Sequence, residues 1–387
     1  MNVLQLISSG GYYGAENVVV SLTESLANKN CRSVIGVFHN DRQRNEELVR
    51  QANRRSLAVQ QIDCRGRWDS QTVKAIREKI EHLNIDILHT HGYKADIYGF
   101  LASRKLGVAL VSTCHLWTHD TAAVRFYDFL DSLFLRRFDA VVAVSETIAA
   151  SLRHSGICGN KICVIDNGID LHSFSQARAT AIEESNKRQK LVVGTAGRLV
   201  PQKGMEYFLR AARDVLEDFP NVIFKVIGSG PERKNLEQMA VDLEVSQNVI
   251  FAGESTDMPG AYASMDVFVL ASIDEGMPMV ILEALASKRA VVATRVGAVP
   301  NLVIHEKTGL LVAPKDIQAL KRAILRLLND ASLRSELGNN GEALVKRGHS
   351  CDFMAQNYLQ LYEQVGERFH ASVFNGKSSP KDILEVQ

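Results

Sequence analysis

The chain lacks the features that mark a nucleic-acid-binding or membrane-spanning protein. Lys and Arg together number 45 and Asp and Glu 44, so the formal net charge over 387 residues is only +1. This balance provides no long-range attraction to nucleic acid or to an anionic membrane. No apolar run approaches the roughly 18 residues that a membrane-spanning helix needs. The composition therefore predicts no nucleic-acid partner and no segment that crosses a bilayer.

Cysteine is scarce and scattered, and the usual metal motifs are missing. The six cysteines form no Cys-x-x-Cys pair, which favours reduced thiols of a cytosolic protein over a disulfide or zinc framework. No Asp-x-Asp pair occurs, so the sequence offers no obvious clamp for a metal-bound diphosphate. We therefore predict a cytoplasmic protein without metal or other cofactor, with membrane contact only as a peripheral option at the inner face.

The chain repeats a short apolar run followed by a segment of helical period. The predicted strands are 3–7, 34–38, 85–89, 109–113, 140–144 and 162–165 in the first half, and 191–195, 222–227, 249–251, 267–270, 290–293 and 310–312 in the second. Strands that alternate with helices of ten to fifteen residues indicate βαβ units and a parallel sheet covered on both faces. The fold class is therefore α/β.

A polar stretch at 171–189 interrupts this rhythm and predicts a linker. We accordingly expect two doubly wound, Rossmann-like domains at 1–170 and 190–350. Ligands of such folds lie beyond the carboxyl ends of the strands, so a cleft between the two facing sheets is the expected site. The last seventeen residues, 371–387, are polar and predict a frayed tail.

The strongest candidate site is the stretch that contains Glu275, Gly276, Met277, Pro278 and Glu283. Pro278 suits the first position of a helix, where its missing N–H costs nothing, and Gly276 allows a ligand to approach the preceding loop. The N–H groups and dipole at this helix start attract an anion. Glu283 lies five residues beyond Pro278, or about 7–8 Å along a helix at ~1.5 Å per residue. One long ligand could contact both glutamates. The alternative makes Glu275 a helix cap and Glu283 a solvated residue.

A second candidate site follows the predicted strand 191–195. Arg198 and Lys203 lie five residues apart, flanked by Gly197 and Gly204. A guanidinium fork and an ammonium point charge at a strand end suit a diphosphate. Surface charges on a loop are the alternative.

Weaker signals come from glycine turns and histidines at strand ends. Gly14 ends a glycine-containing turn after the first strand, and Gly228 and Gly230 lie in a similar turn of the second half. His91 and His115 lie at the carboxyl ends of predicted strands, a place that favours a role in the expected site. A hydrogen-bonded core or rim residue, the commoner fate of a lone histidine, is the alternative. Zinc is disfavoured, because no third and fourth ligand lie at suitable spacing.

Together these residues resemble the family 4 glycosyltransferases, retaining enzymes of the GT-B fold with two facing Rossmann-like domains. The resemblance extends from Val3 to about Phe369. Its most specific part is the pair of glutamates, Glu275 and Glu283, separated by seven residues with Gly276 and Pro278 between them. Gly197-Arg198 followed by Lys203-Gly204 is nearly as specific, and Gly297 and the Thr308-Gly309 pair match further family positions.

The resemblance implies a role for each candidate residue. Arg198 and Lys203 would hold the donor diphosphate, Glu275 the transferred sugar and Glu283 the ribose, with His115 near the sugar. The implied donor-binding set is Gly14, Gly228, Gly230, Gly276, Met277, Pro278 and Glu283. Tyr13 stands where the commoner Gly-Gly-Ala-Glu run has its first glycine, so the contact residue of that loop stays open. The final helix, 351–370, would pack back on the N-terminal domain.

The implied activity is transfer of a hexosyl unit from a UDP- or GDP-linked sugar to a glycan or lipid-linked acceptor, with retention and without metal. A nucleotide-sugar epimerase of the same fold stays open as an alternative. An NAD-dependent oxidoreductase is disfavoured, because the first turn lacks G-x-G-x-x-G and no ribose-binding acid is evident about 20 residues on. A non-catalytic binding scaffold is disfavoured by the co-occurrence of all the charged site residues.

The segment 125–138 bears on the membrane option, since it is both aromatic and basic. It could face a membrane, but Phe126, Phe129, Leu130 and Leu133 form one ordinary apolar stripe. That pattern favours a packed helix.

Overall fold

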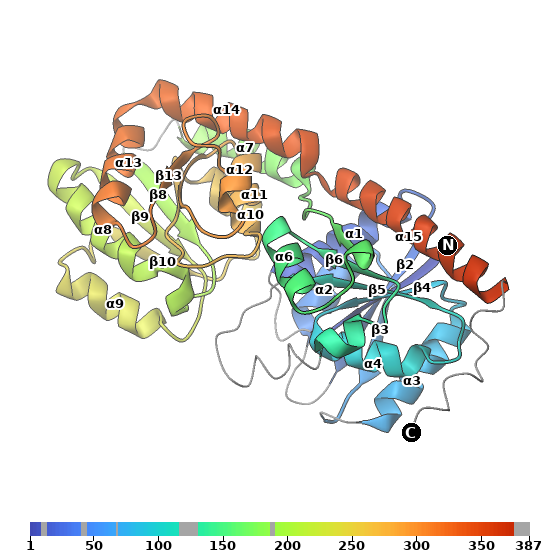
Figure 1. Cartoon of the computed structure of the whole chain (residues 1–387). Helices are drawn as coiled ribbons and strands as arrows, with labels where there is room; N and C mark the ends of the chain where they lie inside the picture. Colours follow the sequence, from blue (N-terminus) through green and yellow to red (C-terminus); the bar gives the residue numbers. More distant parts are fainter. Residues whose placement is uncertain (9–13, 40–44, 67–68, 116–130, 186–189, 375–387) are drawn as a thin grey trace. The chain divides into compact units, whose positions relative to one another are not determined.

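The structure is a computed structural model that describes residues 1–8, 14–39, 45–66, 69–115, 131–185 and 190–374. The chain forms two compact units (Figure 1). The first unit contains Met1–Gly168 and the C-terminal segment that starts at Cys351, and the second contains Ile169–Ser350.

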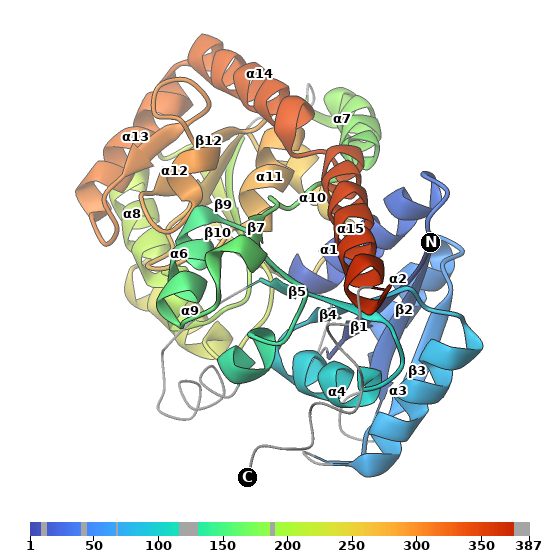
Figure 2. The ribbon, with the colours of Figure 1, turned by 45° about the vertical axis from the view of Figure 1, so that its right-hand side comes forward.

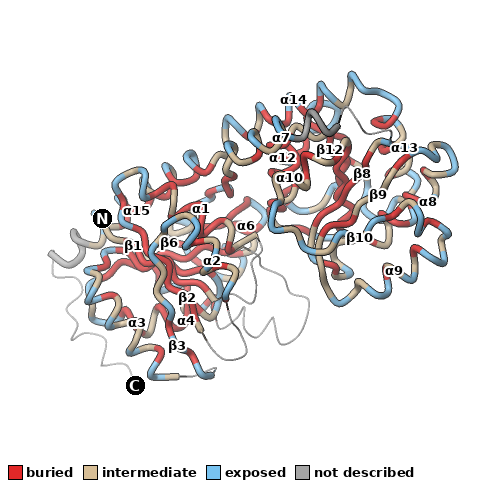
Figure 3. The backbone as a smooth tube through the Cα atoms, turned by 180° about the vertical axis from the view of Figure 1, so that it is seen from behind, coloured by how far each residue is buried: buried red, intermediate tan, exposed pale blue. Residues whose placement is uncertain are grey.

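The first unit is built on a parallel sheet of order β3-β2-β1-β4-β5-β6-β7. Its strands are β1 (Asn2–Ile7), β2 (Arg32–His39), β3 (Val59–Asp63), β4 (Ile87–His91), β5 (Ala109–Cys114), β6 (Ala140–Ala143) and β7 (Ile162–Val164). The apolar runs in β1, β4, β5 and β6 are buried, as expected for a parallel sheet covered on both faces (Figure 3). The strand order reverses between β1 and β4, which makes their carboxyl ends the natural ligand position.

Helices cover this sheet, and one of them comes from the far end of the chain. They are α1 (Gly14–Ala27), α2 (Glu46–Arg54), α3 (Ser70–His82), α4 (Tyr93–Ser103), α6 (Glu146–His154) and α15 (Cys351–Phe374). α15 packs against α1 (Figure 2). Its buried Tyr358 and Tyr362 reach side chains of the sheet strands. Residues 371–374 of the predicted tail continue α15, and 375–387 lie outside the described residues.

The second unit contains a parallel sheet of order β10-β9-β8-β11-β12-β13. Its strands are β8 (Leu191–Ala196), β9 (Val222–Ile227), β10 (Val249–Gly253), β11 (Val267–Leu270), β12 (Ala290–Thr294) and β13 (Leu310–Val312). Its helices are α7 (Leu171–Ser185), α8 (Met205–Asp218), α9 (Arg233–Asp242), α10 (Met258–Ala263), α11 (Met279–Ala286), α12 (Val299–Leu302), α13 (Ile317–Asn329) and α14 (Ala331–Gly348). The strand order reverses between β8 and β11, so loops after these strands meet at the expected ligand position.

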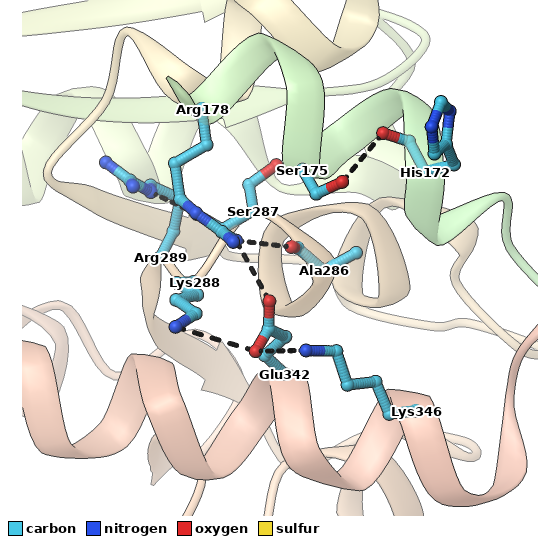
Figure 4. Close-up of polar contacts among 9 residues, drawn as sticks. All are labelled: His172, Ser175, Arg178, Ala286, Ser287, Lys288, Arg289, Glu342 and Lys346. Carbon is cyan, nitrogen blue, oxygen red and sulfur yellow. Dashed lines mark hydrogen bonds and ion pairs between the residues drawn. The ribbon is translucent and has the colours of Figure 1, made fainter. Parts of the chain in front are cut away.

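The prediction of a linker is wrong for residues 171–185. They form α7, which packs against α10 and α11. Figure 4 shows the polar contact that ties α7 to this unit. Arg178 donates to the Glu342 carboxylate at 3.1 Å and to the Ala286 carbonyl at 3.3 Å. Lys288 and Lys346 lie 3.6 and 2.8 Å from the other oxygen of the same carboxylate. Polar composition alone suggested a linker because the partners of these residues lie far away in the sequence.

Two further differences concern single elements. β3 was not predicted, because its sequence Val-Gln-Gln-Ile-Asp lacks an apolar run; it is an edge strand that pairs only with β2. Of the segment 125–138, residues up to 130 lie outside the described residues. The predicted packed stripe is wrong at Leu133, which is 40% exposed, because Leu135 and Phe138 occupy the core instead.

Candidate active site

An ion pair lies at the point where the strand order of the second sheet reverses. Lys203 follows β8 and Glu275 follows β11, and Lys203 Nζ is 2.8 Å from both carboxylate oxygens of Glu275. Ser272 Oγ donates to Glu275 Oε1 at 2.6 Å. The Glu275 side chain is only 6% exposed and that of Lys203 25%. A buried carboxylate needs such partners, which Lys203 and Ser272 supply here.

Glu275 therefore does not cap α11, as the alternative interpretation of the sequence proposed. The α11 start has no side-chain cap at all, and Pro278 immediately precedes the helix instead of occupying its first position. Its N-terminal N–H groups retain the partial positive charge of a helix end. Met277 and Met279 are buried beside this start, at 9% and 8% exposure.

Three glycines shape the loops that carry the charged residues. Gly297, with a φ of 48°, packs so closely that a Cβ there would lie 1.8 Å from the Glu275 carbonyl oxygen. A Cβ on Gly228 would lie 2.0 Å from the Gly197 carbonyl oxygen, and one on Gly230 2.3 Å from that of Leu199. Gly228 and Gly230 thus brace the loop that carries Arg198. Larger residues would displace that loop.

Arg198 lies in this braced loop and is exposed. Among the described residues no carboxylate forms an ion pair with it. A guanidinium without a carboxylate partner is open to bidentate contact with a phosphate. Arg198 and Lys203 both lie in the segment between β8 and α8, and Glu275 lies in the loop that follows β11.

Glu283 is buried inside α11 and is not the solvated residue of the alternative interpretation. The side chain accepts a hydrogen bond from the Tyr262 hydroxyl, 2.7 Å from Oε2, and the residue is 7% exposed. Burial raises the pKa of Glu283, and the Tyr262 bond opposes that rise. The same burial, with the neighbouring carboxylate, raises the pKa of Tyr262 well above its usual value. Sequence reasoning missed Tyr262, because a tyrosine 21 residues away gives no local signal.

Histidines occupy the corresponding edge of the first sheet. His91 ends β4 and His115 directly follows β5, and His91 Nδ1 lies 3.1 Å from His115 Nε2. The two rings stack with centroids 5.3 Å apart. Burial lowers the pKa of His115 to about 4, and burial with two neighbouring histidines lowers that of His91 well below 6.5. Both rings are therefore neutral at physiological pH.

Four expectations from the sequence remain: those on Gly14, on the cysteines, on metal ligands and on membrane-spanning helices. Gly14 begins α1, and the turn before it, residues 9–13, lies outside the described residues. All six cysteines are free thiols. In the described ranges no three His, Cys, Asp or Glu side chains are grouped to hold a metal ion. No helix in the described part of the chain is long and apolar enough to span a bilayer.

Comparisons with known sequences agree with this architecture. The model of the family described as "Glycosyltransferase Family 4" matches residues 12–173, and that of "Glycosyl transferases group 1" matches residues 177–344. An Escherichia coli UDP-Gal:alpha-D-GlcNAc-diphosphoundecaprenol alpha-1,3-galactosyltransferase is 28% identical over 72% of this chain and 77% of its own length. An N,N'-diacetylbacillosaminyl-diphospho-undecaprenol alpha-1,3-N-acetylgalactosaminyltransferase of Campylobacter jejuni is 28% identical over 74% of this chain and 79% of its own.

Solved structures give the same answer for the fold. Anabaena HepE in complex with UDP and glucose superimposes with a TM-score of 0.83 at 21% identity, over 94% of this chain and 100% of the other. The sucrose-phosphate synthase of Thermosynechococcus elongatus gives a TM-score of 0.78 at 22% identity, over 95% and 100% of the two chains. Two family models that together match most of the chain, and two doubly wound parallel sheets, lead to one conclusion. This chain belongs to the family 4 glycosyltransferases and has the GT-B fold.

Proposed function

We propose that this glycosyltransferase moves a hexosyl unit from a UDP- or GDP-linked sugar to a glycan or lipid-linked acceptor, with retention of configuration and without a metal ion. The observation that carries the proposal is the Lys203–Glu275 pair, buried at the β8/β11 reversal and flanked by Arg198 and the start of α11. This edge combines a positive end for phosphates with a carboxylate for hydroxyl groups.

The diphosphate end of the donor binds to the cations. A bound diphosphate adds two or more negative charges, and Arg198, Lys203 and the α11 dipole supply the compensating charge. Lys203 can donate hydrogen bonds to the Glu275 carboxylate and to a phosphate at the same time. Its ammonium group has three N–H donors, and the Glu275 oxygens occupy two of them. Charge-assisted hydrogen bonds contribute about 1.5–3 kcal/mol each. They stabilise the departing phosphate most strongly when its charge is greatest.

The sugar and ribose contacts divide between the two glutamates. Glu275 is fixed by Ser272 and Lys203 and accepts hydrogen bonds from hydroxyls of the transferred sugar. Glu283 has Oε2 bound to Tyr262, which leaves Oε1 as the acceptor for ribose hydroxyls. The neutral His115 is assigned a contact with a hydroxyl of the transferred sugar. Gly14, Gly228 and Gly230 complete the donor loops.

Retention is proposed from the resemblance of the Glu275 and Glu283 arrangement to that of retaining enzymes. Because no covalent nucleophile is assigned among these residues, retention requires substitution on the face that the phosphate leaves. In the proposed reaction the phosphate leaves, and its oxygen takes the proton of the acceptor hydroxyl, which attacks the same face of the sugar. The bond from the sugar carbon to the phosphate oxygen breaks, and a bond from that carbon to the acceptor oxygen forms. An α-linked donor then gives an α-linked product, which NMR of the product determines.

The lipid-linked acceptor is supported by the relatives, since both the Escherichia coli and Campylobacter jejuni enzymes are named for undecaprenol-linked acceptors. A thermal-shift screen of nucleoside diphosphates and their hexose conjugates tests the donor class. Stabilisation by a UDP or GDP series supports the proposal. A donor that is isomerised without any acceptor would instead identify a nucleotide-sugar epimerase.

A further inference from the structure

Seven side chains of the first unit form one continuous hydrogen-bonded series, to which Ser33 is joined through Gln5, and the proposed chemistry uses only its outer end. They are Gln5, His89, His91, Thr113, His115, Tyr358 and Tyr362. All except the half-buried His115 are at most 3% exposed. They come from β1, β4, β5 and α15. Because buried polar groups must be paired, each proton in such a network has a defined position.

The amide of Gln5 sets the direction of the bonds. Its Nε2 can only donate, and it does so to the Tyr362 hydroxyl at 3.2 Å and to Ser33 Oγ at 3.4 Å. Its Oε1 can only accept, and its partner is His91 Nε2 at 2.9 Å. His91 Nε2 must therefore carry a hydrogen.

The position of the hydrogen on His91 determines the position of the hydrogen on His115. A buried neutral imidazole carries one hydrogen, so protonation at Nε2 leaves His91 Nδ1 as an acceptor. His115 Nε2 lies 3.1 Å from that acceptor and must donate to it. His115 consequently carries its own hydrogen at Nε2. The nitrogen that remains for a ligand is Nδ1, and it can only accept.

We propose that Gln5 and His91 act as positioning residues that fix the hydrogen of His115 at Nε2, so that Nδ1 accepts a hydrogen bond from a hydroxyl of the transferred sugar. The sugar contact rests on the proposed function, whereas the proton position rests on the network alone. With the hydrogen at Nδ1 instead, His115 would present a donor, and a hydroxyl would have to turn its own proton elsewhere.

The inner part of the network is compatible with the same direction. Tyr362 accepts from Gln5 and donates to His89 Nδ1 at 2.6 Å. His89 then donates from Nε2 to Thr113 Oγ1 at 2.7 Å, and Thr113 and Tyr358 hydroxyls are 2.9 Å apart. A reversed Gln5 amide would reverse the series, with hydrogens at Nδ1 of all three histidines. The two arrangements therefore give opposite and observable proton positions.

The first experiment is ¹⁵N NMR of the full chain with labelled histidine, which separates protonated from unprotonated ring nitrogens. Spectra of His91→Gln and His115→Gln assign the two rings by difference. We expect the hydrogen at Nε2 in both rings of the wild-type protein. A hydrogen at Nδ1 of His115 overturns the proposal. This measurement needs no donor, acceptor or folded variant of Gln5.

The second experiment compares Gln5→Met with Tyr358→Phe. Met approximates the shape of Gln but has no strong acceptor, so His91 is released and His115 should populate both proton positions. We expect kcat to fall by about 5–30-fold, the size of one lost hydrogen bond, with the donor KM nearly unchanged. Tyr358→Phe removes a hydroxyl of the same network that contacts neither Gln5 nor His91, and it should keep the wild-type spectrum of His115.

The outcomes separate the inference from the function on which it rests. An unchanged His115 spectrum in folded Gln5→Met overturns the positioning role, whatever the enzyme transfers. A changed spectrum with unchanged kcat overturns the sugar contact of Nδ1. If no nucleotide sugar is turned over by the wild-type protein, the proposed function fails while the proton position is still decided by NMR.

Discussion

The two units place polar side chains at equivalent positions of their sheets, but those of the first unit are neutral and those of the second unit are charged. At the β1/β4 reversal of the first sheet, His91 and the adjacent His115 are neutral, because burial lowers their pKa values. At the β8/β11 reversal of the second sheet, Lys203 and Glu275 form an ion pair 2.8 Å apart. The same sheet topology can therefore hold either neutral or charged groups at its strand reversal. The side chains that surround each edge determine which of the two is found there.

This difference matches the two tasks proposed for the units. A diphosphate requires positive charge, which the second unit holds ready in Arg198, Lys203 and the α11 start. Hydroxyl groups of a neutral sugar need hydrogen-bond partners but no compensating charge, and a neutral His115 is such a partner. The comparison predicts different responses to pH, to loss of a charge and to loss of a hydrogen bond.

The largest expected effect is an acid sensitivity of the first unit. The pKa of His115 falls from 6.5 to about 4 on folding, and those of His89 and His91 fall well below 6.5, all chiefly through burial. Stability from these groups is therefore full above pH 6.5 and is lost as pH falls below it. His115 alone accounts for about 3 kcal/mol at ~1.4 kcal/mol for each pH unit.

Native-state hydrogen exchange of the backbone amides in β1, β4 and β5 measures this effect within the first unit. The free energy of unfolding should fall between pH 7.5 and pH 4.5, and His91→Gln should make that fall smaller. His154→Gln, at an exposed site, is the control. Equal slopes in all three proteins would show that the histidines are not held neutral by the fold.

Asp96 acts in the opposite direction in the same unit. Burial raises its pKa from 3.8 to about 6, against the hydrogen bond that Thr90 donates to its carboxyl group. Stability from this group is full below pH 3.8 and is lost as pH rises through 6. Asp96→Asn should therefore make the acid-induced loss of stability steeper than in the wild type. An unchanged slope would contradict a protonated Asp96.

The second largest effect concerns the ion pair. Lys203→Ala removes a cation from the diphosphate and leaves Glu275 buried without its charge partner. We expect kcat/KM to fall by about 10²–10³-fold, as for loss of a group that stabilises transition-state charge. Lys288→Ala is the matched control, because it also removes a partly buried lysine beside a carboxylate of the second unit, Glu342, where two other cations remain. Equal activity losses in both variants would refute a special role for Lys203.

The third effect separates the two glutamates. Glu283→Ala should weaken binding of the free nucleoside diphosphate by roughly 1–3 kcal/mol, or about 5–150-fold, because a ribose acceptor is lost. Glu275→Gln should lower turnover with little change in that affinity, since the free nucleotide has no sugar. Calorimetry beside turnover assays distinguishes the cases. The reverse pattern would mean that the ligand runs in the opposite direction along α11.

The sequence predicted most strands and the main charged residues for a physical reason: a buried parallel strand is a continuous apolar run, and a strand followed by Gly197 and Arg198 is a local pattern. It failed where the cause is remote. α7 appeared to be a linker because the partner of Arg178, Glu342, lies 164 residues away. The bond between Tyr262 and Glu283, and that between Gln5 and Tyr362, likewise join residues that no local pattern connects.

The smallest expected effect is that of a chelator. If Arg198, Lys203 and the α11 start offset the charge of the diphosphate, no metal ion is needed to stabilise its departure. Turnover of the donor should then be nearly the same in excess chelator as in the same chelator saturated with magnesium. Lys203→Ala sharpens the test, because removal of a protein cation should make the residual activity respond to added magnesium more than the wild type does. Wild-type activity that disappears with chelator and returns with magnesium or manganese would instead place a metal ion at the diphosphate, and the charged edge of the second unit would then be incomplete by itself.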